Sequence, residues 1–170
     1  MIAGEGLVAG VRVVRPIVED FAYLARRMRP DEIAQYLAFS GEETYDPDAA
    51  ARRFIETAGP TFAVIGPDGM PLVAGGFWPV RGGVYECWLV GTLESWSTHW
   101  RAITKFCRRL IAVMLEQPNV HRIQLCGMTG RDAAFHWYER SLGFTREGVL
   151  YGYCASGSDA VMFSRRKVQP

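Results

Sequence analysis

Several features are missing from this chain of 170 residues, and each absence excludes a class of protein. Its apolar runs all stay below the roughly 18 residues that a membrane-spanning helix needs. The start, Met1 to Gly10, carries no basic segment, so we expect no signal peptide. The cysteines form no Cys-x-x-Cys pair and no metal-ligand spacing with histidine, which favours free thiols, no metal and a reducing cytoplasmic setting. They are Cys87, Cys107, Cys126 and Cys154.

A strong net charge is also missing. The chain has 19 Lys and Arg against 18 Asp and Glu, a net charge of +1, which indicates neither nucleic acid nor a membrane as partner. The charge is divided unevenly along the chain: residues 1–95 hold 8 basic and 13 acidic residues (−5), and residues 96–170 hold 11 and 5 (+6). A basic C-terminal half could attract a polyanionic ligand, and a solvated basic surface is the simpler interpretation.

The composition that is present is typical of one globular domain. Apolar residues make up 49% of the chain and charged residues 22%, which is ordinary for a domain that buries a core. We expect a flexible N-terminus over residues 1–10, a single domain over 11–165 and a basic tail over 166–170.

Turn residues divide the chain into short segments whose periodicity predicts their structure. Strand patterns lie at Val11–Arg15, Thr61–Gly66, Pro71–Val80, Val84–Thr92, Val120–Cys126, Phe144–Cys154 and Ala160–Ser164. Helical patterns lie at Phe21–Met28 after a cap at Asp20, Glu32–Phe39, Asp46 to about Ala58, Ser97–Glu116 and Arg131–Leu142. Strands mixed with helices in this order predict an α/β sheet with helices on both faces.

One motif connects this order to a known fold. The segment from Arg131 to Phe144 is typical of a short helix stopped by Gly143 and followed at once by a strand. Its Tyr-x-x-x-Leu-Gly-Phe core, which starts at Tyr138, resembles the last helix of the GNAT superfamily of N-acetyltransferases, and the order of elements is similar over nearly the whole chain. The resemblance implies an α/β (α+β) fold with a mixed, mostly antiparallel sheet of about six or seven strands. It also implies transfer of an acetyl group from acetyl-CoA to a small amine or a protein amine, without a metal.

The resemblance assigns two candidate catalytic residues. Glu86 lies on the fourth strand, where several GNAT enzymes place a general base. Tyr138 occupies the position of the acid that protonates the departing thiolate, and the ordinary phenol pKa near 10 suits that role. Plainer interpretations stay open, namely an outward-facing strand glutamate and a half-buried helix tyrosine. His99 and His136 are further candidate bases, but they are more typical of a helix start and of a surface.

The cofactor segment departs from the family pattern. In the GNAT family the fourth strand and the next helix hold the cofactor, whose pyrophosphate lies on N–H groups at the helix N-terminus. Active members usually carry Arg/Gln-x-x-Gly-x-Gly/Ala there, whereas Leu93–Ala102 has no glycine and contains Glu94 and two tryptophans. Arg131 stands where many members have an asparagine, and an arginine there could reach a phosphate. The cofactor-binding candidates are Val90, Gly91, Thr92, Ser97, Thr98, His99, Arg101 and Arg131.

Three stretches resemble a narrower group. They are Met28–Ile33, Cys87–Thr92 and the Trp/Ser-rich segment that enters a basic helix. They are similar to a GNAT-like family of short-tailed bacteriophages, known as internal virion or internal core proteins. Membership would imply a protein in the virion or the host cytoplasm that assembles with itself or with other virion proteins and needs no catalysis. An N-acyltransferase and a non-catalytic virion or host-interaction protein are therefore both hypotheses.

Overall fold

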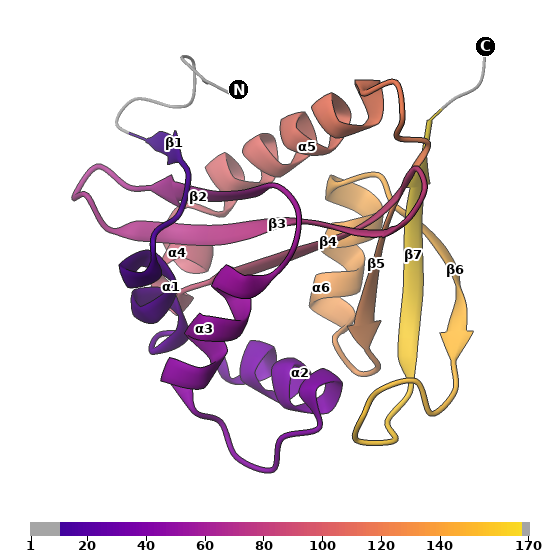
Figure 1. Ribbon diagram of the computed structural model, residues 1–170, viewed down its shortest axis with the longest axis horizontal. Helices are drawn as coiled ribbons and strands as arrows, with labels where there is room; N and C mark the ends of the chain where they lie inside the picture. Colours follow the sequence, from indigo (N-terminus) through magenta and orange to yellow (C-terminus); the bar gives the residue numbers. More distant parts are fainter. Residues whose placement is uncertain (1–10, 168–170) are drawn as a thin grey trace. The chain divides into compact units, whose positions relative to one another are not determined.

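The fold is that of a computed structural model, in which residues 11–167 are described. The predicted flexible N-terminus and the last three residues of the predicted basic tail lie outside this range. The strands form one sheet in the order β1-β2-β3-β4-β5-β7-β6. They are β1 (Arg12–Val14), β2 (Thr61–Ile65), β3 (Pro71–Arg81), β4 (Val84–Gly91), β5 (Arg122–Met128), β6 (Thr145–Leu150) and β7 (Ala160–Arg166) (Figure 1). The helices are α1 (Val18–Ala25), α2 (Pro30–Ser40), α3 (Pro47–Glu56), α4 (Leu93–Thr98), α5 (Trp100–Glu116), α6 (Asp132–His136) and the π-helical turn η1 (Trp137–Ser141).

Antiparallel pairing dominates the sheet. β1 pairs with β2, β2 with β3, β5 with β7 and β6 with β7 in antiparallel fashion, while β4 and β5 are parallel. The predicted mixed, mostly antiparallel α/β sheet is therefore confirmed. The chain forms two compact units. The first comprises the residues up to Arg29 with Asp46–Trp78 and Trp88–Phe106, and the second comprises Pro30–Tyr45, Pro79–Cys87 and the residues from Cys107 onward.

Aromatic side chains form much of the core of the first unit. The ring of Phe21 on α1 lies 6.1 Å from those of Phe54 on α3 and Trp88 on β4, measured between centroids. Phe54 and Trp88 stack with centroids 5.5 Å apart. Phe62 of β2 meets Phe106 of α5 edge-on at 5.0 Å. Burial of these large rings stabilises the packing of α1, α3 and α5 on the strands.

In the second unit, helices pack on both faces of the sheet. On one face Phe135 of α6 lies 5.1 Å from Phe163 of β7, measured between ring centroids. On the other face Ala38 of α2 packs with Cys154 and Ala160 in a buried cluster. Phe163 and Ala160 are three residues apart on β7 and so point to opposite faces, because successive strand residues alternate. The predicted arrangement of helices on both faces is confirmed in this unit (Figure 1).

The two predicted helix caps differ in outcome. Asp46 caps α3 as predicted: its Oδ1 accepts the N–H groups of Asp48, at 2.8 Å, and of Ala49, at 3.3 Å. The cap predicted at Asp20 is wrong, because α1 already begins at Val18. Asp20 lies inside the first turn and accepts the N–H of Ile17 at 3.0 Å. The carboxylate satisfies a backbone donor at the helix start in both cases, but from different positions.

The last two strands correct the predicted boundaries. The strand predicted over Phe144–Cys154 ends at Leu150. The final strand does not stop at Ser164, because Arg165 and Arg166 still pair with β5. The first residue assigned to the basic tail therefore lies in the sheet.

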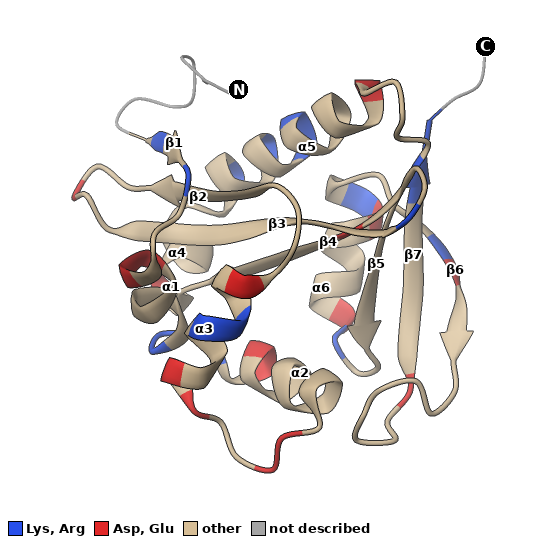
Figure 2. Cartoon of the chain, viewed as in Figure 1, with Lys and Arg blue, Asp and Glu red and all other residues tan. Residues whose placement is uncertain are grey.

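The charge asymmetry of the sequence has a structural location. Basic side chains recur along α5, whereas acidic residues occupy the first turn of α2 and the loop after it (Figure 2). The exposed basic residues of α5 are Arg101, Lys105, Arg108 and Arg109. No helix within residues 11–167 is long and apolar enough to cross a membrane.

Candidate functional site

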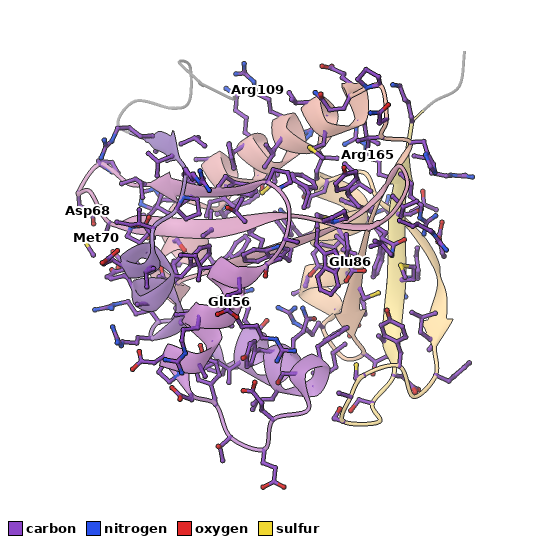
Figure 3. The ribbon with its side chains drawn as sticks, viewed as in Figure 1. Glu56, Asp68, Met70, Glu86, Arg109 and Arg165 are labelled. Atoms are coloured by element: carbon purple, nitrogen blue, oxygen red, sulfur yellow. The ribbon has the colours of Figure 1, made fainter. Side chains whose placement is uncertain are left out.

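Glu86 is the last residue of β4 in its parallel ladder with β5. The ladder begins at Val84 and Arg122 and ends at Glu86 and Gln124, although both strands continue. Gln124 is only 6% exposed and donates its Nε2–H to Oε2 of Glu86 at 3.3 Å. Glu86 itself is half-buried (Figure 3). The plainer interpretation of an outward-facing strand glutamate does not describe this environment.

The surroundings of Glu86 change its acidity. Burial raises the pKa of Glu86 above its ordinary value, and the hydrogen bond from Gln124 opposes the rise because it stabilises the ionised form. Three other titratable groups interact with the Glu86 charge: Cys87, Cys126 and Tyr153. Burial is the main cause that raises the pKa of each, that of Cys126 to about 12. They stay neutral near pH 7, so Glu86 is the ionisable acid here, and a carboxylate of raised pKa is suited to accept a proton.

Tyr138 lies on η1 with its ring among aromatic side chains. The ring centroid of Tyr138 is 5.4 Å from that of Phe163, 5.8 Å from that of Trp137 and 6.2 Å from that of Phe135. These contacts fix the ring, and the half-buried position agrees with the plainer interpretation as well as with a catalytic one. Burial alone therefore does not separate the two.

The helix that carries Tyr138 is not a continuous α-helix. The segment predicted as one helix over Arg131–Leu142 becomes π-helical from Trp137, and Leu142 donates its N–H to the carbonyl of Trp137 at 3.1 Å. Gly143 then ends the helix as predicted, with φ of 73°, a conformation that other residues rarely adopt. π-helical turns are rare and often occur at functional sites.

Glu86 and Tyr138 belong to opposite faces of the sheet. Tyr138 packs on Phe163, whereas Gln124, the hydrogen-bond donor to Glu86, pairs with Ser164 on β7. Because neighbouring strand residues point to opposite faces, Phe163 and Ser164 mark the two sides. Their cooperation in one reaction stays a prediction.

The segment after β4 forms a helix that the sequence analysis missed. Thr92 is the N-cap residue of α4. Its Oγ1 accepts the N–H of Ser95 at 3.0 Å, and Ser95 Oγ donates to the carbonyl of Thr92 at 2.8 Å. His99 donates its N–H to the carbonyl of Ser95 at 2.8 Å, after which α5 starts at Trp100. The single helix predicted from Ser97 is therefore wrong at its start. The overlooked signal was the pair of hydroxyl residues three apart, which is typical of a helix cap.

Gly91 has no side chain, and the side chains of Trp96 and Val73 occupy the space beside it. A methyl group at Gly91 would lie 2.8 Å from Nε1 of Trp96 and 2.8 Å from Cγ1 of Val73. The guanidinium of Arg29 lies over the Trp96 ring, 4.9 Å from its centroid. Among the predicted cofactor-binding residues, Val90, Gly91 and Thr92 are buried, and Trp96 lies against Gly91.

Arg131 is buried and holds α2. Its Nη1 donates to Oε1 of Gln35 at 2.7 Å, and its Nη2 pairs with Oδ2 of Asp31 at 2.7 Å. Gln35 Oε1 also accepts the N–H of Met128 at the end of β5, at 3.1 Å. Both terminal nitrogens of Arg131 are thus directed at α2, and contact with a cofactor phosphate stays a prediction.

Comparisons with known proteins identify the fold. No protein-family model and no curated protein matches the sequence. Solved structures do match: a GNAT-family acetyltransferase from Bacillus anthracis has a TM-score of 0.72 at 14% identity, over 95% of this chain and 98% of that one. Spermidine N-acetyltransferase from Vibrio cholerae, solved with CoA and spermine, has a TM-score of 0.70 at 15% identity, over 94% of this chain and 97% of that one. The chain has the GNAT fold.

One solved structure with this fold holds CoA. In the segment where the cofactor is predicted to bind, this chain offers exposed side chains rather than a glycine-lined backbone. Ser97 and Thr98 are exposed, although Ser97 Oγ also donates to the carbonyl of Glu94 at 2.9 Å. Arg101 is exposed in the first turn of the 17-residue helix α5 and supplies a positive charge at the helix end that favours anions. Within residues 11–167, no cluster of His, Cys, Asp and Glu could hold a metal ion.

Proposed function

We propose that this GNAT-fold chain is an N-acyltransferase that moves an acetyl group from acetyl-CoA to an amine. The observation that carries the proposal is Glu86, a half-buried carboxylate of raised pKa that receives a hydrogen bond at the end of the β4–β5 ladder. The likeness to a spermidine N-acetyltransferase supports a small amine as acceptor.

Glu86 and Tyr138 divide the proton transfers between them. An amine is protonated near neutral pH and attacks only after losing a proton, which a carboxylate oxygen of Glu86 accepts. Acetyl-CoA, when bound, supplies the activated acetyl group. The new bond joins the amine nitrogen to the acetyl carbon, the carbon–sulfur bond breaks, and Tyr138 gives its Oη proton to the departing sulfur. As the amide forms, its nitrogen loses a second proton to water; water also takes up the proton held by Glu86 and returns one to Tyr138, so each transfer releases one proton overall.

The residues after β4 would hold the cofactor. Val90 and Gly91 are the last residues of β4 and Thr92 comes next, and their backbone would lie beside the cofactor. The side chains of Ser97, Thr98 and Arg101 would bind its phosphates, with His99 at the junction of α4 and α5. Arg131 would act indirectly in this account, by keeping α2 on the end of β5. An arginine and hydroxyls can replace backbone donors because each forms a charge-assisted hydrogen bond with a phosphate oxygen.

The direct test is CoA release in the presence of a panel of small amines, polyamines and amine-bearing peptides. We expect amine-dependent release by the native chain and its loss in Glu86→Gln. If no acceptor gives release above the rate of the Glu86→Gln variant, the enzyme proposal fails. Calorimetric titration with CoA shows separately whether the cofactor binds.

A second candidate function is favoured by the segment after β4. Trp96 fills the space above Gly91, and the hydroxyls of Thr92 and Ser95 satisfy backbone groups of α4 itself. A chain that had lost cofactor binding could show this closure, and it would agree with the resemblance to internal virion proteins of phages. Such a protein would work in the virion or the host cytoplasm, assembling with itself or with other virion proteins. Purified particles that lack the protein would exclude that role.

A further inference from the structure

A row of hydrogen-bonded side chains crosses the second unit and ends at Glu86. On β7, Ser164 donates its hydroxyl to Oε1 of Glu147 at 2.6 Å. Glu147 of β6 receives both terminal nitrogens of Arg122, at 2.8 and 2.6 Å. Arg122 of β5 donates its Nε–H to Oε1 of Gln124 at 3.0 Å. Gln124 donates to Glu86 of β4 at 3.3 Å. Five side chains on four neighbouring strands are therefore connected.

The row has a direction that follows from the chemistry of arginine. A guanidinium has five N–H donors and no acceptor, so Arg122 requires the carbonyl oxygen of Gln124 to face it. The amide nitrogen of Gln124 must then face Glu86. The orientation of a glutamine amide is usually hard to assign from its shape, but here the partner on one side determines it.

Charge holds the far end of the row in place. Hydrogen bonds from Arg122 and Ser164 lower the pKa of Glu147 to about 2, so Glu147 is ionised near neutral pH. The bidentate pair fixes the plane of the guanidinium, and the Nε–H that points to Gln124 is fixed with it. Gln124 and Ser164 are 6% and 2% exposed, so water competes little for these bonds.

We propose that Gln124 is a positioning residue that holds the carboxylate of Glu86, and that Arg122 and Glu147 keep its amide turned toward that carboxylate. Removing the amide takes away the donor that stabilises ionised Glu86. The titratable groups that interact electrostatically with Glu86 are Cys87 on its own strand, Cys126 on β5 and Tyr153 in the loop after β6. All three are neutral near pH 7, so none of them adds a charge that would offset the loss. The catalytic consequence rests on the proposed function, but the effect on Glu86 does not.

The effect on Glu86 is measured by NMR titration of side-chain carboxyl carbons. Glu86→Gln identifies the Glu86 signal by deleting it. In Gln124→Met, which keeps the length of the side chain but has no donor, we expect the Glu86 midpoint to move to higher pH than in the native chain. Gln117→Met is the matched control, because Gln117 donates to the carbonyl of Val113 on α5 at 3.2 Å and should leave the midpoint unchanged. An unmoved midpoint in Gln124→Met overturns the proposal.

Glu147→Gln tests the same row from its half-exposed end, should Gln124→Met fail to fold. Loss of the carboxylate removes the bidentate pair that orients the guanidinium of Arg122. The titration midpoint of Glu86 should therefore move to higher pH, as in Gln124→Met, but by a smaller amount. If Glu147→Gln leaves the midpoint where it is in the native chain, the holding role of Arg122 and Glu147 is excluded.

The pH dependence of kcat/KM distinguishes a positioning role from general damage to the fold, because such damage would lower the rate equally at every pH. In Gln124→Met, kcat/KM below the midpoint should fall about tenfold and recover at higher pH, with KM for acetyl-CoA unchanged. An equal loss at every pH would contradict positioning. If the native chain shows no transfer at all while the midpoint still moves in Gln124→Met, the proposed function fails and the positioning role stands.

Discussion

Two segments of this chain differ in the partners of their polar side chains: those of one form hydrogen bonds across strands, and those of the other form hydrogen bonds within the segment itself. Along the row from Ser164 to Glu86, each side chain is hydrogen-bonded to the next one, and the last carboxylate has a raised pKa. After β4, the hydroxyls of Thr92 and Ser95 close on each other, and Trp96 covers Gly91. The side chains around the proposed base thus support one another, while the segment proposed to bind phosphate lacks a glycine-lined backbone.

The largest expected effect is at Glu86. Glu86→Gln removes the base, so kcat should fall about 100-fold or more, within the range for loss of a general base. The variant should be at least as stable as the native chain near pH 7, because burial disfavours the ionised carboxylate that it replaces. Initial rates of CoA release and thermal melts measure the two properties. A fully active variant would remove Glu86 from the mechanism.

Tyr138→Phe should lower kcat about 10- to 100-fold and leave KM unchanged. The ring stays packed on Phe163, and only the proton-bearing hydroxyl is lost. The matched control is Tyr151→Phe, because Tyr151 is 84% exposed and should have no effect. Equal rates for the two variants would leave Tyr138 as a packing residue.

Gly91→Ala should destabilise the fold by about 1–3 kcal/mol, because the added methyl would meet Trp96 and Val73. Gly82→Ala is its control, since a Cβ at Gly82 meets no other atom within 4 Å. Denaturant unfolding measures both variants. Combining Gly91→Ala with Trp96→Ala should cost less than the sum of the single changes, because the clash with Trp96 is gone while that with Val73 remains. Additive costs would show that Trp96 does not fill this space.

Arg101→Ala should raise KM for acetyl-CoA about threefold to tenfold without changing kcat, because one exposed charge contributes modestly to phosphate binding. The increase should shrink at high salt, where the native chain also binds less tightly. Arg109→Ala, an exposed change two turns along α5, is the control. If both variants leave KM unchanged, the cofactor phosphates do not bind at the start of α5.

The smallest effect concerns stability against pH. The folded pKa of Glu147 is about 2, below the ordinary value of 4.5, so its contribution is present above pH 4.5 and is lost as pH falls toward 2. Glu147→Gln should therefore be less stable than the native chain near pH 7, and the difference should vanish at low pH. Glu86 has the opposite sign, because its raised pKa gives a contribution that is lost as pH rises through that pKa. Unfolding midpoints measured across pH check both signs, and parallel curves would contradict the argument.

Local signals in the sequence predicted most of the fold. Asp46 followed by proline marked the start of α3, and Gly143 marked the end of the Tyr138 helix, because each residue type satisfies one backbone requirement. Turn residues and the apolar segments between them located the strands within residues 11–167 to within a few positions. The conversion of the Tyr138 helix to a π-helical turn was not predicted, since its periodicity is that of an ordinary helix.

The contacts that define the candidate site escaped prediction because they join distant residues. Arg131 pairs with Asp31, 100 positions away, and Gln124 donates to Glu86, 38 positions away. No local pattern indicates such pairs, which depend on the register of neighbouring strands. Glu86 was found only through its place on the fourth strand, and its partner Gln124 was not singled out at all.

The pH dependence of amine-dependent CoA release, compared between the native chain and Glu86→Gln, tests the central claim most directly. The account predicts that release by the native chain falls at low pH as Glu86 takes up a proton, and that Glu86→Gln shows only a low rate without this dependence. A native chain whose release is absent, or keeps the same pH dependence in Glu86→Gln, would contradict it.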